Sequence, residues 1–162
     1  MPTDADEFTA FAKARMDRWR RTAYLLCRDV HAADDLVSTM LGKLYRDWRR
    51  ISALDNVDAY ARRMLTRAWL DETRTPWWRR RANQEVPEVA VAQPHPVEDR
   101  DALWRMLGAL GRRQRAVIVL RFYLDLSVEE TAEILGITTG TVKSQSARAL
   151  ETLRGQAKDL AR

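Results

Sequence analysis

The segment at residues 127–150, SVEETAEILGITTGTVKSQSARAL, constrains the fold most, because its small and apolar residues have the spacing of a helix-turn-helix. Ala132 would let two helices approach closely, Gly136 can adopt the left-handed conformation of a tight turn, and Val142 would anchor the second helix on the first. The segment therefore predicts two short crossed helices, and DNA is the first ligand to consider for them.

The second helix of this pair carries polar side chains on its expected outer surface. Thr138 or Thr139 can cap its first turn. The outward positions are Thr141, Lys143, Ser144, Gln145, Ala147 and Arg148. Hydroxyl, amide and cationic groups in this arrangement are typical of helices that contact base edges and phosphates. Neither a plain helical hairpin nor a structural adaptor would explain why this surface is polar.

Composition narrows the class of protein. The chain has 162 residues, of which 46% are hydrophobic and 31% charged, as expected for a soluble globular protein. It contains no apolar run of the roughly 20 residues that span a membrane, and its first residues do not form a signal peptide, so we expect a cytoplasmic protein without a membrane partner. The single cysteine, Cys27, beside two leucines, predicts a buried, inert thiol. Only two histidines are present, so we expect no metal site. We also expect no cofactor.

The net charge of +5 is distributed unevenly. Residues 1–81 carry 17 Lys and Arg against 12 Asp and Glu, residues 82–101 carry 1 against 5, and residues 102–162 carry 10 against 6. Two basic parts therefore flank an acidic one. Basic parts favour a polyanionic partner through counterion release, and two such parts that packed together would make the free chain bind DNA poorly.

Hydrophobic periodicity predicts an all-α protein, because apolar residues recur at helical spacing and no alternating strand pattern is present. The expected helices before the linker include the stretches 8–19, 32–48 and 57–68, the last of them capped by Asp55 or Asn56. Two further short helices are expected between the linker and the helix-turn-helix. The prediction is two small helical domains, 1–81 and 99–162, joined by a flexible acidic linker at 82–98 that holds three of the five prolines.

These features together resemble a bacterial extracytoplasmic-function (ECF) sigma factor, a branch of the sigma-70 superfamily. LGRRQRAVIVLRFYLDLSVEETAEILGITTGTVKSQSARALETLR, from Leu110 to Arg154, resembles the family's region 4. HAADDLVSTMLGKLYRDWRRI and DAYARRMLTRAWLDETR resemble its region 2. The combination is similar to the actinobacterial sigma-E-like subgroup, and it covers nearly the whole chain.

The resemblance implies a dissociable RNA polymerase subunit that directs the core enzyme to promoters and is not itself an enzyme. Region 4 would recognise the −35 element through the six outward residues of the helix-turn-helix named above. Arg112, Arg113 and Arg115, just upstream, are suited to phosphate contacts. The resemblance also implies contact with the β flap of the polymerase and leaves room for an anti-sigma factor as a partner.

Region 2 of the family binds the clamp coiled coil of the polymerase β′ subunit and opens the −10 element. The residues that align with the polymerase-binding surface are Asp34, Asp35, Leu36, Arg46 and Trp48. Asp34 and Asp35 would lie in the first turn of their helix, where they also interact favourably with its dipole. Aromatic and cationic groups suited to a flipped base and a single strand are Arg63, Arg67, Trp69, Arg74, Trp77 and Trp78.

Three positions depart from the family pattern. Many members have Gln and an acidic residue where this chain has Ser38 and Thr39, and many have Asn in place of Arg67. The preferred −10 base therefore cannot be transferred from relatives.

Two other functions fit parts of the sequence: an ordinary helix-turn-helix regulator with a dimerising or sensing N-terminal domain, and a recombinase or transposase. The regulator does not explain a basic N-terminal domain that ends in WWRRR, and the enzyme lacks a recognisable metal-binding constellation.

Overall fold

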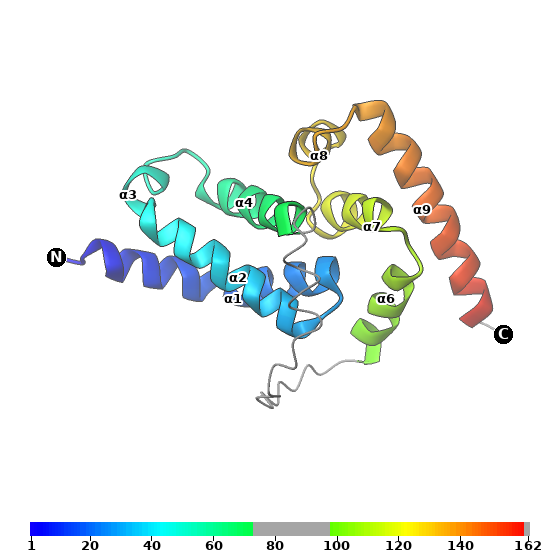
Figure 1. The fold of residues 1–162 in the computed structure, drawn as a ribbon, viewed down its shortest axis with the longest axis horizontal. Coiled ribbons are helices and arrows are strands. Elements are labelled where there is room, and N and C mark those ends of the chain that lie inside the picture. Colours follow the sequence, from blue (N-terminus) through cyan, green and yellow to red (C-terminus); the bar gives the residue numbers. More distant parts are fainter. Residues whose placement is uncertain (73–97, 161–162) are drawn as a thin grey trace.

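The computed structural model describes residues 1–72 and 98–160, and within these ranges every regular element is a helix (Figure 1). The helices are α1 (Asp4–Cys27), α2 (Val30–Arg46), α3 (Trp48–Ile51), α4 (Val57–Glu72), α6 (Glu98–Gly108), α7 (Arg112–Ile118), the π-helical turn η1 (Val119–Tyr123), α8 (Val128–Leu135) and α9 (Thr139–Leu160). The all-α prediction is confirmed. Glu98, the last residue of the predicted linker, already belongs to α6, and the rest of that linker lies outside the described residues.

Side-chain caps set where the first two helices begin. Thr3 and Asp6 form a capping box at the start of α1, in which the Asp6 N–H donates to Thr3 Oγ1 over 3.2 Å and the Thr3 N–H donates to Asp6 Oδ2 over 3.1 Å. The Asp29 side chain accepts from the N–H groups of the following two residues and caps α2. Because of this cap, α2 begins earlier than the apolar pattern predicts. Asp34 and Asp35 consequently lie in its second turn, and the first-turn prediction is wrong.

The predicted helix at 32–48 is divided into two elements. α2 ends at Arg46, and Asp47 separates it from the single turn α3, which begins at Trp48. Trp48 therefore belongs to a different element from the other residues predicted to contact the polymerase.

α4 has a side-chain cap. Of its two candidate caps, Asn56 is the one whose Oδ1 accepts a hydrogen bond, over 3.0 Å from the Ala59 N–H.

The core of the N-terminal domain lies among α1, α2 and α4. Leu26, Leu36 and Leu65 from these three helices are at most 1% exposed. An aromatic group packs beside them, with the Phe11 and Trp48 ring centroids 5.1 Å apart. Arg15 on α1 forms an ion pair with Asp58 in the first turn of α4. The Arg15 guanidinium also stacks on the Phe11 ring, 3.9 Å from the ring centroid. Polar and apolar contacts therefore both hold α4 against α1.

The two halves of the chain share one hydrophobic core. Leu107, Leu110 and Val119 from the C-terminal half belong to the same buried cluster as the leucines of α1, α2 and α4. In Figure 1, α4 and α7 lie next to each other across the middle of the molecule, although α6 separates them in the sequence. α9 runs along the side of the molecule that is away from α1 and α2. The basic halves therefore pack together in this structure. Within residues 1–72 and 98–160, no helix is both long and apolar enough to cross a bilayer.

Candidate DNA-binding surfaces

The helix-turn-helix is built by two caps and one glycine. Ser127 and Glu130 form a capping box at the start of α8, with hydrogen bonds of 3.0 and 3.2 Å. Gly136 ends α8 at φ 67°, the left-handed conformation expected of it. Thr138 is the cap of α9, because its Oγ1 accepts from the Thr141 N–H over 3.1 Å. These local interactions orient α9 relative to α8.

A small apolar cluster holds the two helices together. Val117, Ala132 and Val142 are buried and pack against each other, so Ala132 and Val142 have the roles predicted for them. Ser146 lies on the same inward side, and its hydroxyl oxygen is buried without a hydrogen-bond partner among residues 1–72 and 98–160. Packing against α7 and α8 therefore fixes which face of α9 is buried, and the opposite face of α9 lies at the surface.

The outer surface of α9 presents the predicted recognition residues. Lys143, Ser144, Ala147 and Arg148 are exposed, and Thr141 and Gln145 are half-buried. Neither Lys143 nor Arg148 forms an ion pair within the described residues. These two cations and the adjacent hydroxyl are available to a partner with negative charge and hydrogen-bonding groups, as the major groove of DNA has.

The three arginines upstream are placed at the junction of the two halves. Arg112 and Arg113 are exposed at the start of α7, and Arg115 is half-buried. Burial lowers the pKa of Arg115, and the nearby charges of Arg28 and Arg112 lower that pKa further. Partial desolvation of the Arg112 guanidinium, which stacks on the Trp69 ring 4.7 Å from its centroid, lowers the pKa of that residue as well. One of the predicted phosphate contacts is thus engaged with the N-terminal domain.

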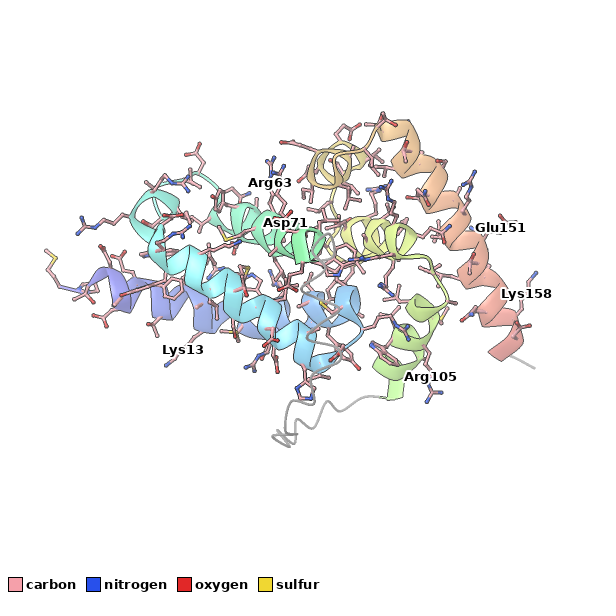
Figure 2. All side chains as sticks on the ribbon, viewed as in Figure 1. Lys13, Arg63, Asp71, Arg105, Glu151 and Lys158 are labelled. Carbon is pink, nitrogen blue, oxygen red and sulfur yellow. The ribbon has the colours of Figure 1, made fainter. Side chains whose placement is uncertain are left out.

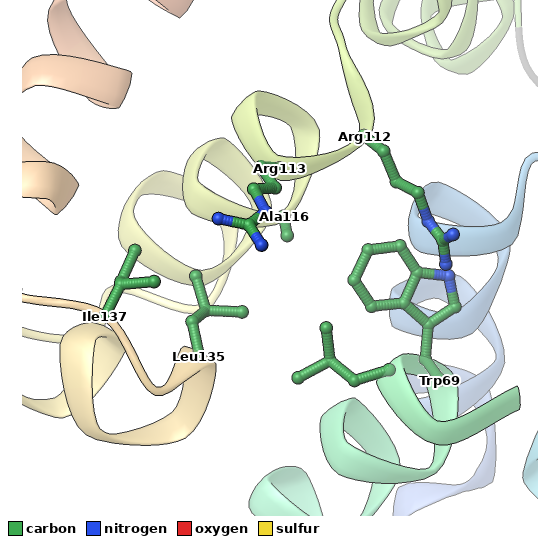
Figure 3. A pocket seen from close by; sticks show the side chains of 7 residues that line it. Trp69, Arg112, Arg113, Ala116, Leu135 and Ile137 are labelled. Carbon is green, nitrogen blue, oxygen red and sulfur yellow. The ribbon is translucent and has the colours of Figure 1, made fainter. Parts of the chain in front are cut away.

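An apolar cavity of about 220 Å³ lies next to this stacked pair (Figure 3). It opens between the end of α4 and the helix-turn-helix, and its lining residues are Trp69, Leu70, Arg112, Arg113, Ala116, Leu135 and Ile137. The close-up shows the Arg112 side chain lying against the Trp69 ring, while Leu135 and Ile137 approach from the other side. The cavity is a gap in the contact between the two domains.

The predicted −10 residues on α4 have three different environments. Arg67 is exposed. Arg63 is half-buried, and its Nη1 lies 2.9 Å from Glu133 Oε1 on α8. Trp69 is only 4% exposed, so its predicted role as an accessible aromatic does not hold in this conformation. The i, i+4 spacing of Trp69 from Leu65 on the apolar stripe could have predicted its burial. Arg74, Trp77 and Trp78 lie outside the described residues.

The predicted polymerase-binding residues are similarly divided. Asp35 and Arg46 are exposed on α2, and Asp34 is half-buried with its carboxylate 3.9 Å from Arg20. Leu36 is 0% exposed and Trp48 is 6% exposed, so both are core residues here rather than surface contacts. Leu36 falls one helical turn before the buried Met40, a spacing that indicates the core. The accessible polar residues of this set therefore all lie on α2.

Sequence reasoning missed the residues that join the two domains. Glu133 belongs to the first helix of the helix-turn-helix, and its sequence context gives no sign of a partner on α4. Trp104 on α6 is stacked on Tyr24 of α1, with ring centroids 5.9 Å apart and planes inclined by 12°. The Arg28 guanidinium lies 4.4 Å from the centroid of the Trp104 ring. These contacts depend on how the halves dock, and no local pattern reveals them.

Comparison with known proteins places these features in one family. Residues 100–153 match the sequence model of the family Sigma-70, region 4. The chain is 39% identical to the RNA polymerase sigma-E factor of Streptomyces coelicolor, over 95% of this chain and 89% of the relative. It is 31% identical to the ECF RNA polymerase sigma factor SigC of Mycobacterium tuberculosis, over 91% of this chain and 82% of the relative.

The fold is also found among solved structures. The sigma factor RpoE of Bartonella quintana, solved in complex with the anti-sigma factor NepR, gives a TM-score of 0.71 at 24% identity, over 94% of this chain and 97% of that one. CnrH, solved in complex with the cytosolic domain of CnrY, gives a TM-score of 0.62 at 17% identity, over 94% of this chain and 88% of that one. The solved structures share the fold, and the relatives above show the family: this chain belongs to the extracytoplasmic-function sigma factors of RNA polymerase, and it is a sigma-E-like transcription initiation factor.

Proposed function

We propose that this sigma factor binds core RNA polymerase as a dissociable subunit and directs it to promoters, with α9 at the −35 element and α4 at the −10 element. The observation that carries the proposal is the surface of α9, where Lys143, Ser144 and Arg148 stand exposed above a packed apolar face. A helix held in this way can enter the major groove without unfolding any part of its domain.

At the −35 element, we assign base readout to the first turns of α9. Ser144 can donate to or accept from base edges, and Lys143 and Arg148 can bind guanine or phosphate. Gln145, half-buried beside them, offers an amide for adenine. Arg113 is exposed and suited to a phosphate contact that positions the domain without reading sequence.

At the −10 element, we assign the grip on the opened strand to the cations of α4. Arg67 is exposed and can bind a phosphate of the single strand. Arg63 becomes available only when its ion pair with Glu133 is broken. The proposal for the polymerase surface is narrower than the sequence prediction and rests on Asp34, Asp35 and Arg46 of α2, because these side chains reach the surface.

The chain acts as an initiation factor and carries no catalytic activity of its own, since the polymerase supplies the chemistry. It works in the cytoplasm, where promoter DNA and polymerase are found. An anti-sigma factor is proposed as an additional partner, supported by the complex of the Bartonella quintana protein, which shares this fold, with the anti-sigma factor NepR.

The test is reconstitution. Purified chain is mixed with bacterial core RNA polymerase, and the complex transcribes a library of promoter fragments, with core enzyme alone as the control. We expect stoichiometric binding and new transcription start sites that share upstream motifs. If a cognate core enzyme fails to bind the chain while the free protein binds a palindromic duplex specifically, the protein is an ordinary regulator instead.

A further inference from the structure

The apolar cavity between the end of α4 and the helix-turn-helix takes no part in the function proposed above. Its volume is about 220 Å³. Trp69 and Leu70 line it from α4, and Ala116, Leu135 and Ile137 line it from the C-terminal half. Figure 3 shows the Trp69 ring on one side of this space and the Leu135 and Ile137 side chains on the other. Apolar walls offer a water molecule few hydrogen bonds, so the cavity suits an apolar group better than water.

The volume of the cavity indicates how large that group can be. An apolar cavity of about 150 Å³ is large enough to bind benzene. At about 220 Å³, this cavity can hold a bicyclic aromatic ring. An aromatic ring also suits the wall formed by Trp69, because aromatic pairs gain from edge-to-face or offset stacking in addition to burial.

The charged groups at the cavity are both cationic. Arg112 and Arg113 line it together with the apolar walls, and none of its described lining residues is acidic. Arg113 is exposed and forms no ion pair within residues 1–72 and 98–160. Figure 3 shows its guanidinium on the same side of the cavity as Leu135. A positive charge at the edge of an apolar space favours a ligand with one apolar part and one anionic part.

Arg112 adds a second positive charge without a carboxylate partner. It forms no ion pair with a described residue, and its guanidinium lies 4.7 Å from the centroid of the Trp69 ring. Partial desolvation of this guanidinium lowers the pKa of Arg112. A nearby anion would stabilise the charged form of both arginines, and a carboxylate can accept two parallel hydrogen bonds from one guanidinium.

We propose that this cavity is a binding site for a small aromatic carboxylate. The aromatic ring of the ligand lies between Trp69 and the side chains of Leu135 and Ile137, and Arg113 binds its carboxylate at the edge of the cavity. Arg112 contributes the second positive charge and fixes the position of the Trp69 ring by stacking on it. The ligand is bound without covalent chemistry, and the inference does not rest on the proposed function.

The test is a calorimetric titration of the full-length chain with three probes. 2-Naphthoate carries both the bicyclic ring and the carboxylate, 2-naphthamide replaces the carboxylate with a neutral amide of similar shape, and acetate lacks the ring. A probe of about 13 non-hydrogen atoms should bind with a Kd of about 0.1–1 mM. We expect 2-naphthoate to bind one site with this affinity, 2-naphthamide to bind at least about fivefold more weakly, and acetate to show no binding at about 10 mM.

Arg113→Gln tests the contact with the carboxylate, and Arg105→Gln is its matched control. Both arginines are exposed, and each change removes one positive charge from the C-terminal half. Arg105 does not line the cavity, and Figure 2 shows it at α6, on the side of the molecule away from α8. R113Q should weaken binding of 2-naphthoate by about fivefold or more and leave 2-naphthamide unchanged, whereas R105Q should bind both probes as wild type does.

Leu135→Trp tests the apolar part of the site. The change places a bicyclic side chain in the space that the ring of the ligand needs, so it should weaken 2-naphthoate and 2-naphthamide alike, by at least about tenfold. Thermal unfolding followed by circular dichroism shows whether the variant folds, and Ile137→Phe provides the same test if it does not. In wild type, saturating 2-naphthoate should raise the melting temperature, because the site is complete only in the folded chain.

Several results would overturn the site. These are equal affinities for 2-naphthoate and 2-naphthamide, an equal effect of R113Q and R105Q, unchanged binding in a folded cavity-filling variant, and no binding of 2-naphthoate at about 10 mM. Failure of promoter-specific transcription would refute the proposed function and leave these binding measurements as they are. The two conclusions are therefore refuted by different results.

Discussion

Replacing Lys143 and Arg148 together with alanine should weaken holoenzyme binding at the −35 element and reduce its dependence on salt. Both side chains are exposed on α9 and form no ion pair within the described residues, so their removal should change the free energy of unfolding by less than about 0.5 kcal/mol. If both contact phosphate, the slope of log K against log salt should fall by about 1.8, because each contact contributes about 0.9.

This slope has a measurable consequence. Between about 50 and 200 mM salt, the loss of affinity should be about twelvefold smaller for the double variant than for wild type. A base contact by either residue would add about 1–3 kcal/mol of lost affinity at the cognate sequence only. The assay is a salt titration of holoenzyme on cognate and scrambled −35 duplexes by fluorescence anisotropy.

The matched control replaces Arg154 and Lys158, two exposed cations farther along the same helix, with alanine. This control removes the same charge from α9 at positions beyond the proposed groove contact, and its slope should stay near that of wild type. Equal slopes for wild type and the Lys143 and Arg148 variant, together with equal affinity for the cognate duplex, would refute the placement of α9 at the DNA. Equal losses in both double variants would show a general charge effect instead.

Four further predictions concern other parts of the chain. Asp35→Lys should weaken binding to core polymerase in a pull-down while leaving duplex binding intact, and loss of both in a folded variant would contradict this division. Gly136→Ala should cost about 1–2 kcal/mol in urea unfolding, because the residue is left-handed while, its chain neighbours apart, no atom of the described residues lies within 4 Å of an added Cβ, and Gly136→Asn should cost less. Leu65→Ala should cost about 3 kcal/mol and Leu65→Met less than about 1.5, and a neutral alanine would disprove the core assignment. Burial is the main cause that raises the pKa of the Cys27 thiol from 9.0 to about 12, so this thiol should resist a disulfide reagent at neutral pH until the chain unfolds. The protonated thiol should stabilise the fold fully below pH 9, and this stabilisation should be lost between pH 9 and about 12. Cys27→Ala should not show that loss in unfolding measurements across this pH range.

Local features explain why so much of the helix-turn-helix could be predicted. A glycine that must be left-handed, a threonine that caps and apolar residues at helical spacing each act within a few residues of the chain. Gly136, Thr138 and Val142 have the predicted roles for this reason. α2 begins two residues before the predicted start because its cap, Asp29, precedes the apolar stripe.

Sequence by itself determined the all-α class, the turn of the helix-turn-helix and the polar surface of α9, because caps and helical periodicity are properties of neighbouring residues. Only the tertiary structure decided that Trp69 is covered by Arg112 and that Arg63 pairs with Glu133. The partners in each pair are more than 40 residues apart and meet only when two separate helical domains dock. Aromatic and cationic side chains suit both DNA and a protein interface, so their chemistry alone could not tell which of the two they face.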